Sequence, residues 1–403
     1  MSQAPAATRG TGVVVAAAAR TPIASYGKSL KDLPPSELGA LAARTAIERA
    51  GLQPEQIEHV VFGNVIHTEP RDMYMARVVG MKAGLPKETP AFTVNRLCGT
   101  GVQAIVSAAQ AIQSGDVDVA LAGGAESMSR APYWVPDARW GARMGDKPLV
   151  DPVISGLTDP FHDILMGVTA ENLAEQMDIS REEQDAFAVE SHRRAVAAQE
   201  AGRFDEQIVP VPLKSRKGET LFARDEHLRP DASLEQMAKL PPVFKREGGT
   251  VTAGNSSGMN DAGGALVLLS EQKAHELGTP VRARILAAAS CGVDPRIMGI
   301  GPVPAVKKVL ERSGVGLSDI GVIELNEAFA AQAIAVMRDL DLDPAKVNPN
   351  GGAIGMGHPI AATGAAITTK ALYELERGDH QLALVTLCIG GGQGIALLLE
   401  RAA

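Results

Sequence analysis

An internal repeat constrains the fold of this 403-residue chain more than any other feature of its sequence. Glu311 lies 263 residues after Glu48, and the same separation recurs along the chain as far as Leu121 and Leu384. Chance identities between alanines and glycines would not keep one register over such a distance, so we predict a duplicated domain. The other positions that share this separation are Arg49 and Arg312, Gly51 and Gly314, Ile57 and Ile320, Thr100 and Thr363, Gly101 and Gly364, Ala108 and Ala371, Gly115 and Gly378, Asp116 and Asp379, and Ala120 and Ala383.

Short apolar runs alternate with alanine-rich stretches of helical length, which predicts a layered α/β fold. The runs typical of buried strands are Val13–Val15, Val60–Phe62, Val117–Leu121, Ala265–Leu269, Val322–Leu325 and Leu382–Leu387. The helices predicted between them are Ser36–Ala50, Gly101–Gln113, Val303–Ser313 and Thr363–Glu376.

The repeat also suggests where the halves begin and end. We predict that residues 1–122 and 250–275 form the first half and that residues 276–403 form the second. The intervening stretch, 123–249, is rich in charged residues and prolines. It is predicted to be an inserted loop domain that contacts substrate.

Two local signals lie within that insertion. Ser180 and Glu183 have the spacing of a capping box, which predicts a helix that begins there and ends near Gly202. The sequence KSRKGE, from Lys214 to Glu219, is predicted to be a charged surface loop.

The composition excludes several classes of protein. A net charge of -8 and an aromatic content of 3% argue against nucleic-acid binding and against attraction to an anionic membrane. No apolar run approaches the ~20 residues that span a bilayer. Three cysteines without ligand spacing argue against a disulfide framework and a structural zinc site, so we expect no metal and a reducing, cytoplasmic location. The first twelve residues lack the apolar segment of a signal peptide and are predicted to form a frayed tail.

Cys98 stands where an extended segment passes into an alanine-rich helix. The unpaired N–H groups and the positive dipole at a helix N-terminus favour a thiolate. The glycines of CGTG also let the backbone approach a ligand closely. A reactive nucleophile and a buried structural cysteine are both compatible with this position.

Two further glycine-rich segments carry groups suited to acyl transfer. His358 lies in GMGHP, where its imidazole is placed to take a thiol proton or to donate to an oxyanion; a loop histidine bonded to a backbone carbonyl is the alternative. Cys388 ends an apolar run and enters IGGGQG, whose N–H groups suit an oxyanion hole. The alternative for this loop is nucleotide phosphate binding. It is disfavoured because the chain has neither GxGxxG after its first strand nor GxxxxGK[ST].

Asn326 lies in LNEAFAAQ, where a predicted strand passes into a helix. It is suited to cap that helix, or to orient a water molecule or a carbonyl group. Glu327 beside it points in a different direction and is not taken as a catalytic acid. Cys291 has no polar neighbour in the sequence and is expected in the core.

Taken together, these segments resemble the thiolase family, the acetyl-CoA C-acyltransferases. The resemblance covers the chain from about Val13 to its C-terminus and rests on NRLCGTGVQAI, GGAESMSRAPY, MGVTAEN, VTAGNSSGMNDAGGA, NEAFAAQ, GMGHP and CIGGGQG. FGNVIHTEPRDMY and RWGARMGD are most similar to bacterial β-ketothiolases of broad chain-length range that work beside polyhydroxyalkanoate synthesis. The resemblance implies a five-layered αβαβα fold of two βαβαβαββ halves with an inserted loop domain.

The resemblance also implies a role for each matching residue. Cys98 matches the nucleophile that becomes acylated, His358 the histidine that activates it, and Cys388 the acid and base that acts on the acetyl methyl group. Asn326 matches the residue that positions a water molecule in one oxyanion hole, and the N–H groups of Cys98 and Gly390 match the second hole. The residues that match contacts to coenzyme A or the acyl pocket are Arg229, Ser257, Leu157, Met166, Met298 and Phe329.

These matches imply a ping-pong Claisen condensation of acetyl-CoA with an acyl-CoA, which gives 3-ketoacyl-CoA and CoA and runs in reverse as thiolysis. CoA is a substrate, so no cofactor is implied. The family implies a homotetramer, or a dimer. Two alternatives stay open. A ketoacyl-synthase-like enzyme would decarboxylate malonyl thioesters, against which Cys388 argues, and a non-catalytic acyl-CoA-binding protein would have lost a catalytic group.

Two positions depart from the family pattern. Leu165 stands where short-chain members often carry histidine, so the pocket is expected to be more apolar. Ala361 replaces the glycine that usually follows GHPI, and alanine would be strained if the loop needs a positive φ there. Thr100 stands where serine is usual, which is a minor difference.

Overall fold

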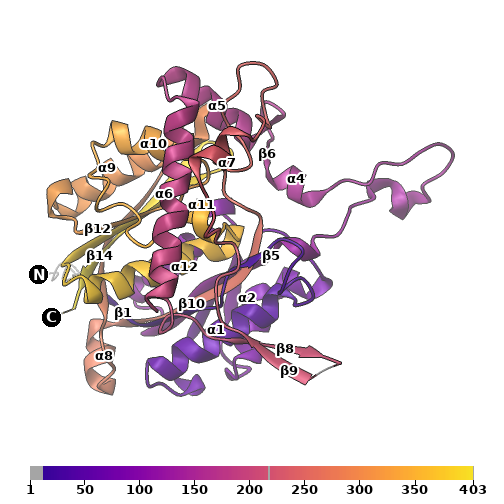
Figure 1. Cartoon of the computed structure of the whole chain (residues 1–403). Coiled ribbons are helices and arrows are strands. Elements are labelled where there is room, and N and C mark those ends of the chain that lie inside the picture. The colour runs from indigo at the N-terminus through magenta and orange to yellow at the C-terminus, as the bar shows by residue number, and fades with distance from the viewer. Residues whose placement is uncertain (1–11, 217, 403) are drawn as a thin grey trace, which may run out of the picture.

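The computed structural model describes residues 12–216 and 218–402, and its main feature is one large mixed sheet (Figure 1). The predicted frayed tail, up to residue 11, lies outside the described residues. The strands of this sheet are β1 (Val13–Arg20), β2 (Ala24–Ser25), β3 (His59–Gly63), β4 (Ala91–Val94), β5 (Val119–Ser127), β10 (Asn260–Ser270), β11 (Ala283–Gly292), β12 (Val322–Leu325), β13 (Leu382–Ile389) and β14 (Gln393–Arg401). They pair in the order β12-β13-β14-β11-β1-β10-β5-β3-β4, with β2 beside β10.

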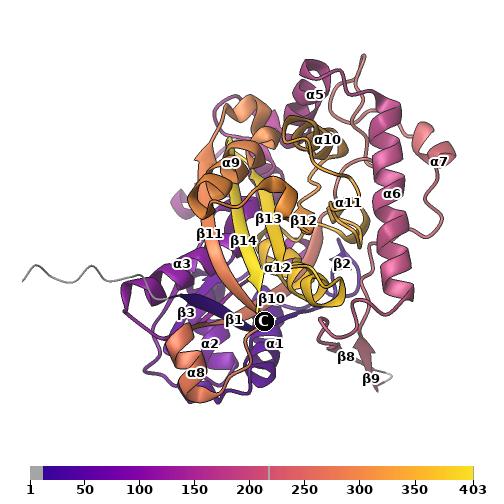
Figure 2. The ribbon, with the colours of Figure 1, turned by 90° about the vertical axis from the view of Figure 1, so that its left-hand side faces the viewer.

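The helices stack against this sheet in alternating layers. Helices α3 (Thr100–Ser114) and α12 (Ile360–Arg377) pack against each other between the two halves of the sheet. Helices α1 (Pro35–Arg49) and α2 (Met75–Lys82) cover the outer face of the first half. Helices α9 (Pro302–Ser313) and α10 (Ala330–Asp339) cover the outer face of the second (Figure 2). The predicted αβαβα layering is therefore confirmed.

The two halves repeat the same unit. In the first half, β3 and β5 are parallel neighbours and α3 leads into β5; in the second, β12 and β13 are parallel neighbours and α12 leads into β13. The halves are linked at the sheet by a short pairing in which Val14 and Val15 of β1 face Arg284 and Ala283 of β11. The duplication read from the sequence is thus a duplication of structure.

The repeated Thr-Gly pairs lie where the two central helices cross. A Cβ atom added to Gly101 would lie 2.5 Å from the backbone nitrogen of Ala365 and 2.9 Å from the Cα atom of Gly364. A Cβ atom added to Gly364 would in turn collide with the backbone nitrogen of Val102. Only glycine at both positions lets the helix backbones approach this closely.

Most predicted elements are present, and the largest difference is at β5. The strand predicted from Val117 to Leu121 begins at Val119 and continues to Ser127, across the predicted division between 122 and 123. Its last five residues pair with Asp261–Ala265 of β10, and this long-range pairing is invisible to a local apolar pattern.

The inserted segment contains α4 (Pro152–Gly156), α5 (Met166–Gln176), α6 (Arg181–Glu200), α7 (Leu234–Ala238) and the short strand pair β6 (Thr158–Asp159) and β7 (Ile164–Leu165). The predicted capping box is confirmed: Ser180 Oγ accepts the Glu183 N–H at 3.2 Å, and Glu183 accepts the Ser180 N–H at 2.9 Å. Between β5 and α4, the chain projects from the body as a long arm (Figure 1).

The segment predicted as a charged surface loop, Lys214–Glu219, is exposed as expected where the structure describes its side chains, but it is not an irregular loop. The segment belongs to a hairpin of β8 (Val211–Ser215) and β9 (Gly218–Phe222), in which Lys214 faces Glu219. The flanking Val211 and Phe222 pack against Leu30 and Leu38 of the first half, and this contact stabilises the strands.

Two further short helices are α8 (Glu271–Leu277), which follows β10, and α11 (Ala353–Met356), which leads to His358. Among the residues that the structure describes, no helix combines the length and apolarity that crossing a bilayer requires.

Candidate active site

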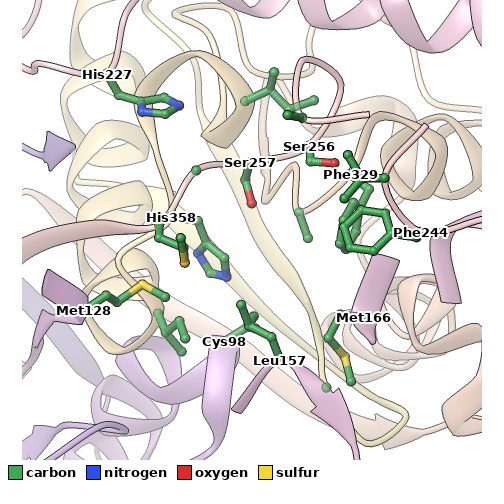
Figure 3. Close-up of a pocket in the computed structure, with 18 of the residues that line it drawn as sticks. Cys98, Met128, Leu157, Met166, His227, Phe244, Ser256, Ser257, Phe329 and His358 are labelled. Carbon is green, nitrogen blue, oxygen red and sulfur yellow. The ribbon is translucent and has the colours of Figure 1, made fainter. Parts of the chain in front are cut away.

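A largely apolar cavity of about 400 Å³ lies between the inserted segment and both halves of the repeat. Figure 3 shows His358 beside Cys98 in its middle, His227 toward one end, and Phe244 and Phe329 along one wall. The predicted site residues that line it are Cys98, Leu157, Met166, Arg229, Ser257, Met298, Phe329, His358 and Gly390. Cys388 and Asn326 are buried and do not line it.

Cys98 lies in a single helical turn, Leu97–Gly99, directly before α3. The turn is held by Thr100, whose hydroxyl oxygen accepts the Arg96 N–H at 2.8 Å, and by Asn95, which accepts the Leu97 N–H at 2.9 Å. Leu97 has a φ of 45°, a left-handed conformation that leucine rarely adopts. Such strain persists only where the surrounding contacts impose it, and here it directs Cys98 into the cavity.

The Cys98 thiol is neutral at rest. Although the cavity leaves part of the residue accessible, burial raises the pKa of its thiol to about 11, while the N–H groups of Gly390 and of Cys98 itself bond to the sulfur and oppose that rise. The expectation that a helix N-terminus would favour a resting thiolate is therefore wrong, because desolvation outweighs the helix end. The two N–H groups predicted to form an oxyanion hole do converge on this sulfur.

His358 is held from both sides, in the loop between α11 and α12. Its backbone N–H donates to Asn260 Oδ1 at 2.8 Å, and its Nδ1 lies 2.6 Å from Thr363 Oγ1. The Thr363 hydroxyl donates its single hydrogen to the Pro359 carbonyl at 3.1 Å, so it accepts from Nδ1–H. The lone pair is then on Nε2, which has no hydrogen-bond partner within the described chain. The alternative of a ring bonded to a backbone carbonyl is wrong.

Burial also keeps this imidazole neutral. His358 is 6% exposed, and desolvation lowers its pKa to about 4. A neutral ring with a free Nε2 is a base, and the Cys98 thiol lies beside it in the same cavity. The pair therefore rests as thiol and imidazole rather than as an ion pair.

Cys388 and Asn326 lie behind this pair, at the ends of neighbouring strands. Cys388 is fully buried near the end of β13, and burial together with the charge of Cys98 raises the pKa of its thiol well above the ordinary value. Cys388 belongs to the same apolar cluster as Met166 and Phe329, which line the cavity. Asn326 follows β12, and neither polar atom of its side chain has a partner within the described chain. It does not cap α10, since Phe329 occupies the N-cap position.

Two histidines that the sequence analysis did not select lie at another part of the cavity. His192, from α6, and His227 stack with ring centroids 6.4 Å apart, and His192 Nδ1 accepts the Arg229 N–H at 3.3 Å. Burial lowers the pKa of each imidazole to about 4. The only signal in the sequence was the proximity of His227 to Arg229 in DEHLRP.

The positions that depart from the family pattern, and the third cysteine, are also placed. Ala361 lies in the first turn of α12 and has no positive φ, so the expected strain is absent. Leu165 is half-buried and precedes α5 without lining the cavity. Cys291 is half-buried on β11 rather than in the core, and all three cysteines are free thiols.

Comparisons with known proteins agree with this geometry. The family model described as "Thiolase, N-terminal domain" matches residues 13–272, and "Thiolase, C-terminal domain" matches residues 279–401. Beta-ketothiolase BktB of Cupriavidus necator is 60% identical over 389 residues, covering 96% of this chain and 99% of its own. An acetyl-CoA acetyltransferase of Syntrophomonas wolfei is 49% identical and covers 96% of this chain and 98% of its own.

Solved structures show the same relationship. Human mitochondrial 3-ketoacyl-CoA thiolase superposes with a TM-score of 0.95 at 46% identity, over 97% of this chain and 99% of that chain. The same human protein in complex with CoA gives a TM-score of 0.94, covering 98% of each chain. With both family models matched in order and almost the whole length aligned, this chain belongs to the thiolase family.

Proposed function

We propose that this protein is a β-ketothiolase, an acyltransferase that condenses acetyl-CoA with an acyl-CoA to give 3-ketoacyl-CoA and CoA, and that catalyses CoA-dependent thiolysis in reverse. One observation carries the proposal: Cys98 and His358 line one cavity with the N–H groups of Gly390 and Cys98 at the Cys98 sulfur, and Cys388 is buried in the apolar cluster that contains the cavity-lining Met166 and Phe329. The similarity to Beta-ketothiolase BktB supports a place beside polyhydroxyalkanoate metabolism.

The first half-reaction acylates Cys98. His358 Nε2 removes the thiol proton, and the thiolate attacks the carbonyl carbon of the acyl-CoA. The oxyanion accepts hydrogen bonds from the N–H groups of Cys98 and Gly390, each worth ~3 kcal/mol in comparable acyl transfers. The bond to the CoA sulfur then breaks, and CoA leaves as a thiol with the proton of Cys388. This leaves an acyl-Cys98, an imidazolium at His358 and a thiolate at Cys388.

The second half-reaction forms the carbon–carbon bond. The Cys388 thiolate removes an α-proton from acetyl-CoA, and the enolate oxygen is stabilised by the imidazolium of His358 and by a water molecule bound to Asn326. The enolate carbon attacks the acyl-Cys98 carbonyl, the carbon–sulfur bond breaks, and His358 returns its proton to Cys98. Burial raises the pKa of the Cys388 thiol, so its thiolate is a stronger base. The difference in pKa between this thiol and the weakly acidic α-carbon of acetyl-CoA is therefore smaller.

The rest of the cavity is suited to CoA and the acyl chain. Arg229 supplies the positive charge that a phosphate needs in a chain of net charge -8. The apolar residues expected along the pantetheine arm and acyl group are Leu157, Met166, Met298 and Phe329, with Ser257 as a hydrogen-bonding group. CoA is a substrate, and the proposed steps move protons and an acyl group but no electrons, so they require neither a metal nor a redox cofactor.

Mass spectrometry of the intact protein after mixing with acetyl-CoA tests this proposal. The wild type is expected to gain one acetyl group on Cys98, Cys98→Ala none, and Cys388→Ala is expected to gain it without releasing acetoacetyl-CoA. Condensation by Cys388→Ala at the wild-type rate contradicts the two-cysteine mechanism. Release of CO2 from malonyl-CoA would favour the ketoacyl-synthase alternative, and binding of acetyl-CoA without any adduct would favour a non-catalytic protein.

A homotetramer in the cytoplasm is part of the proposal. The arm between β5 and α4 exposes Trp140 at 79% and Met144 at 99%, and the sheet ends at β4 with Phe92 exposed at 44%. Apolar side chains and a free strand edge favour contacts between copies. Light scattering coupled to size-exclusion chromatography distinguishes a tetramer from a dimer, and fractionation of cells tests the location.

A further inference from the structure

One buried carboxylate joins three parts of the chain beside the nucleophile. Glu126, near the end of β5, is 0% exposed. Its Oε1 accepts the Asn64 side-chain amide at 2.9 Å and the Ile66 N–H at 3.1 Å. Its Oε2 accepts the Val65 N–H at 3.3 Å and the Ala361 N–H at 3.1 Å. Four N–H donors therefore surround two oxygen atoms, which leaves each oxygen acting only as an acceptor.

The segments that Glu126 holds form the wall against which Cys98 rests. Val65 and Ile66 come from the loop after β3, and Ile360 precedes Ala361 at the start of α12. These three side chains belong to the same apolar cluster as Cys98, together with Met128 and Leu157. Ile360 and Met128 also line the cavity.

The first turn of α12 sits directly on β5 at this point. A Cβ atom added to Gly124 would collide with the carbonyl oxygen of Ala361, so β5 and the helix are in backbone contact two residues before Glu126. Because His358 lies three residues before Ala361, the same contact connects the carboxylate to the loop that carries the imidazole.

We propose that Glu126 is a positioning residue, whose carboxylate fastens Asn64–Ile66 and the start of α12 to β5 and so fixes the apolar wall behind the Cys98 sulfur. This inference rests on the proposed function, in which Cys98 is the acylated nucleophile. Glu126 touches neither the sulfur nor the cavity, and acts through the segments that it holds. An error of about 1 Å in placing a reacting group costs on the order of 100-fold in rate, so loosening this wall has a measurable effect.

The charge of Glu126 adds a second effect that a packing role alone would not have. Its carboxylate is one of the groups that raise the pKa of the Cys98 thiol. Burial raises the pKa of Glu126 itself to about 8; the backbone N–H groups of Ile66, Ala361 and Val65 oppose that rise, and the nearby Asp72 adds to it. Glu126 is therefore charged over the range near pH 11 in which Cys98 loses its proton, and removing that charge lowers the pKa of Cys98, the opposite of what deeper burial of the thiol would do.

Glu126→Gln tests the proposal, since the amide nitrogen must face two of the four donors. We expect kcat for thiolysis to fall about 10- to 100-fold while KM for CoA stays within about twofold. Alkylation of Cys98 by iodoacetamide, followed by peptide mass spectrometry, is expected to shift its pH midpoint downward by about 0.5 unit. Asp72→Asn is the matched control for the loss of a buried carboxylate: Asp72 is also 0% exposed and accepts the N–H groups of Thr68 and Glu69, and its removal favours the charged form of Glu126 rather than removing it.

Asn64→Ala keeps the carboxylate and removes one donor, so it is expected to show a smaller loss of kcat in the same direction even if Glu126→Gln does not fold. Wild-type kcat in both variants overturns the proposal. An equal loss of kcat in Asp72→Asn, matched by an equal loss of thermal stability, also overturns it and indicates a general folding effect. The alkylation profile does not depend on thiolase turnover, so a wild type that forms no acyl-Cys98 contradicts the proposed function and not this inference.

Discussion

The two copies of the repeat use the same helix crossing to present different chemistry. In the first copy, the Thr100 hydroxyl accepts the backbone N–H of Arg96 and so fixes the turn that carries Cys98. In the second copy, the equivalent Thr363 hydroxyl donates to the Pro359 carbonyl and accepts from the His358 ring. Both threonines hold a residue four positions earlier, but only Thr363 also contacts a reactive group.

The pKa values of the reactive groups also differ between the two copies. Burial raises the pKa of the thiol in the first copy to about 11 and lowers that of the imidazole in the second to about 4. One desolvated environment therefore makes the acid weaker and the base weaker, and keeps both groups uncharged until substrate arrives. Both copies place a central helix in the same position, and the short segment before each helix determines whether a thiol or an imidazole faces the cavity.

Replacing the reactive group of the second copy should have the largest effect. His358→Asn removes the base of the first half-reaction and the group that stabilises the enolate and returns a proton to Cys98 in the second, so we expect kcat for thiolysis to fall about 1,000-fold or more. Steady-state kinetics with acetoacetyl-CoA and CoA measures this, with Cys291→Ala as a thiol-to-methyl control away from the cavity. A loss below tenfold would mean that another group activates Cys98.

The close packing of α3 against α12, to which both copies contribute, is tested by adding a side chain where the two helices cross. Gly101→Ala and Gly364→Ala each place a Cβ atom against the backbone of the other helix, so each should lower the free energy of unfolding by about 1–3 kcal/mol. Thermal unfolding compares them with Gly156→Ala, where an added Cβ atom meets nothing within 4 Å. If only one variant is destabilised, the two copies do not contribute equally to the crossing.

The two threonines should separate the roles of the copies. Thr363→Val removes the acceptor that selects the Nε2 lone pair of His358, so kcat should fall about 10- to 100-fold, and Thr363→Ser should restore it. Thr100→Val keeps the methyl group beside Gly63 and loses only the hydrogen bond from the Arg96 N–H. We therefore expect kcat to change less than about threefold. Comparable losses in both valine variants would show that the hydroxyls act only on the backbone.

The pH dependence should show the smallest effect. Because His358 titrates at about 4 and Cys98 at about 11, the single-turnover rate of Cys98 acetylation should vary less than about twofold between pH 5.5 and 7.5. The rate should fall only as the pH approaches 4 and the imidazole gains a proton. Rapid-quench mass spectrometry follows the adduct directly. If the rate of acetylation instead fell with a midpoint near about pH 6.5, the ordinary pKa of histidine, the His358 ring would have to be hydrated in solution.

The sequence by itself determined the duplication, the α/β layering, the positions of the main strands and helices, and the identity of Cys98, His358 and Cys388 as candidates. These properties depend on local apolar periodicity, on a repeated register and on motifs, all of which a single chain displays directly. The capping box at Ser180 was readable for the same reason, since both of its partners lie within four residues.

Only the tertiary structure decided the extension of β5 to Ser127, the hairpin around Lys214, the tautomer of His358, the neutral state of Cys98 and the place of Glu126. Each of these depends on groups brought together from distant positions: β10 beside β5, α1 beneath the hairpin, and α12 against the segment after β3. Burial, which sets both the proton affinities and the partners of the buried polar groups, exists only after the two copies and the insertion have packed around one cavity.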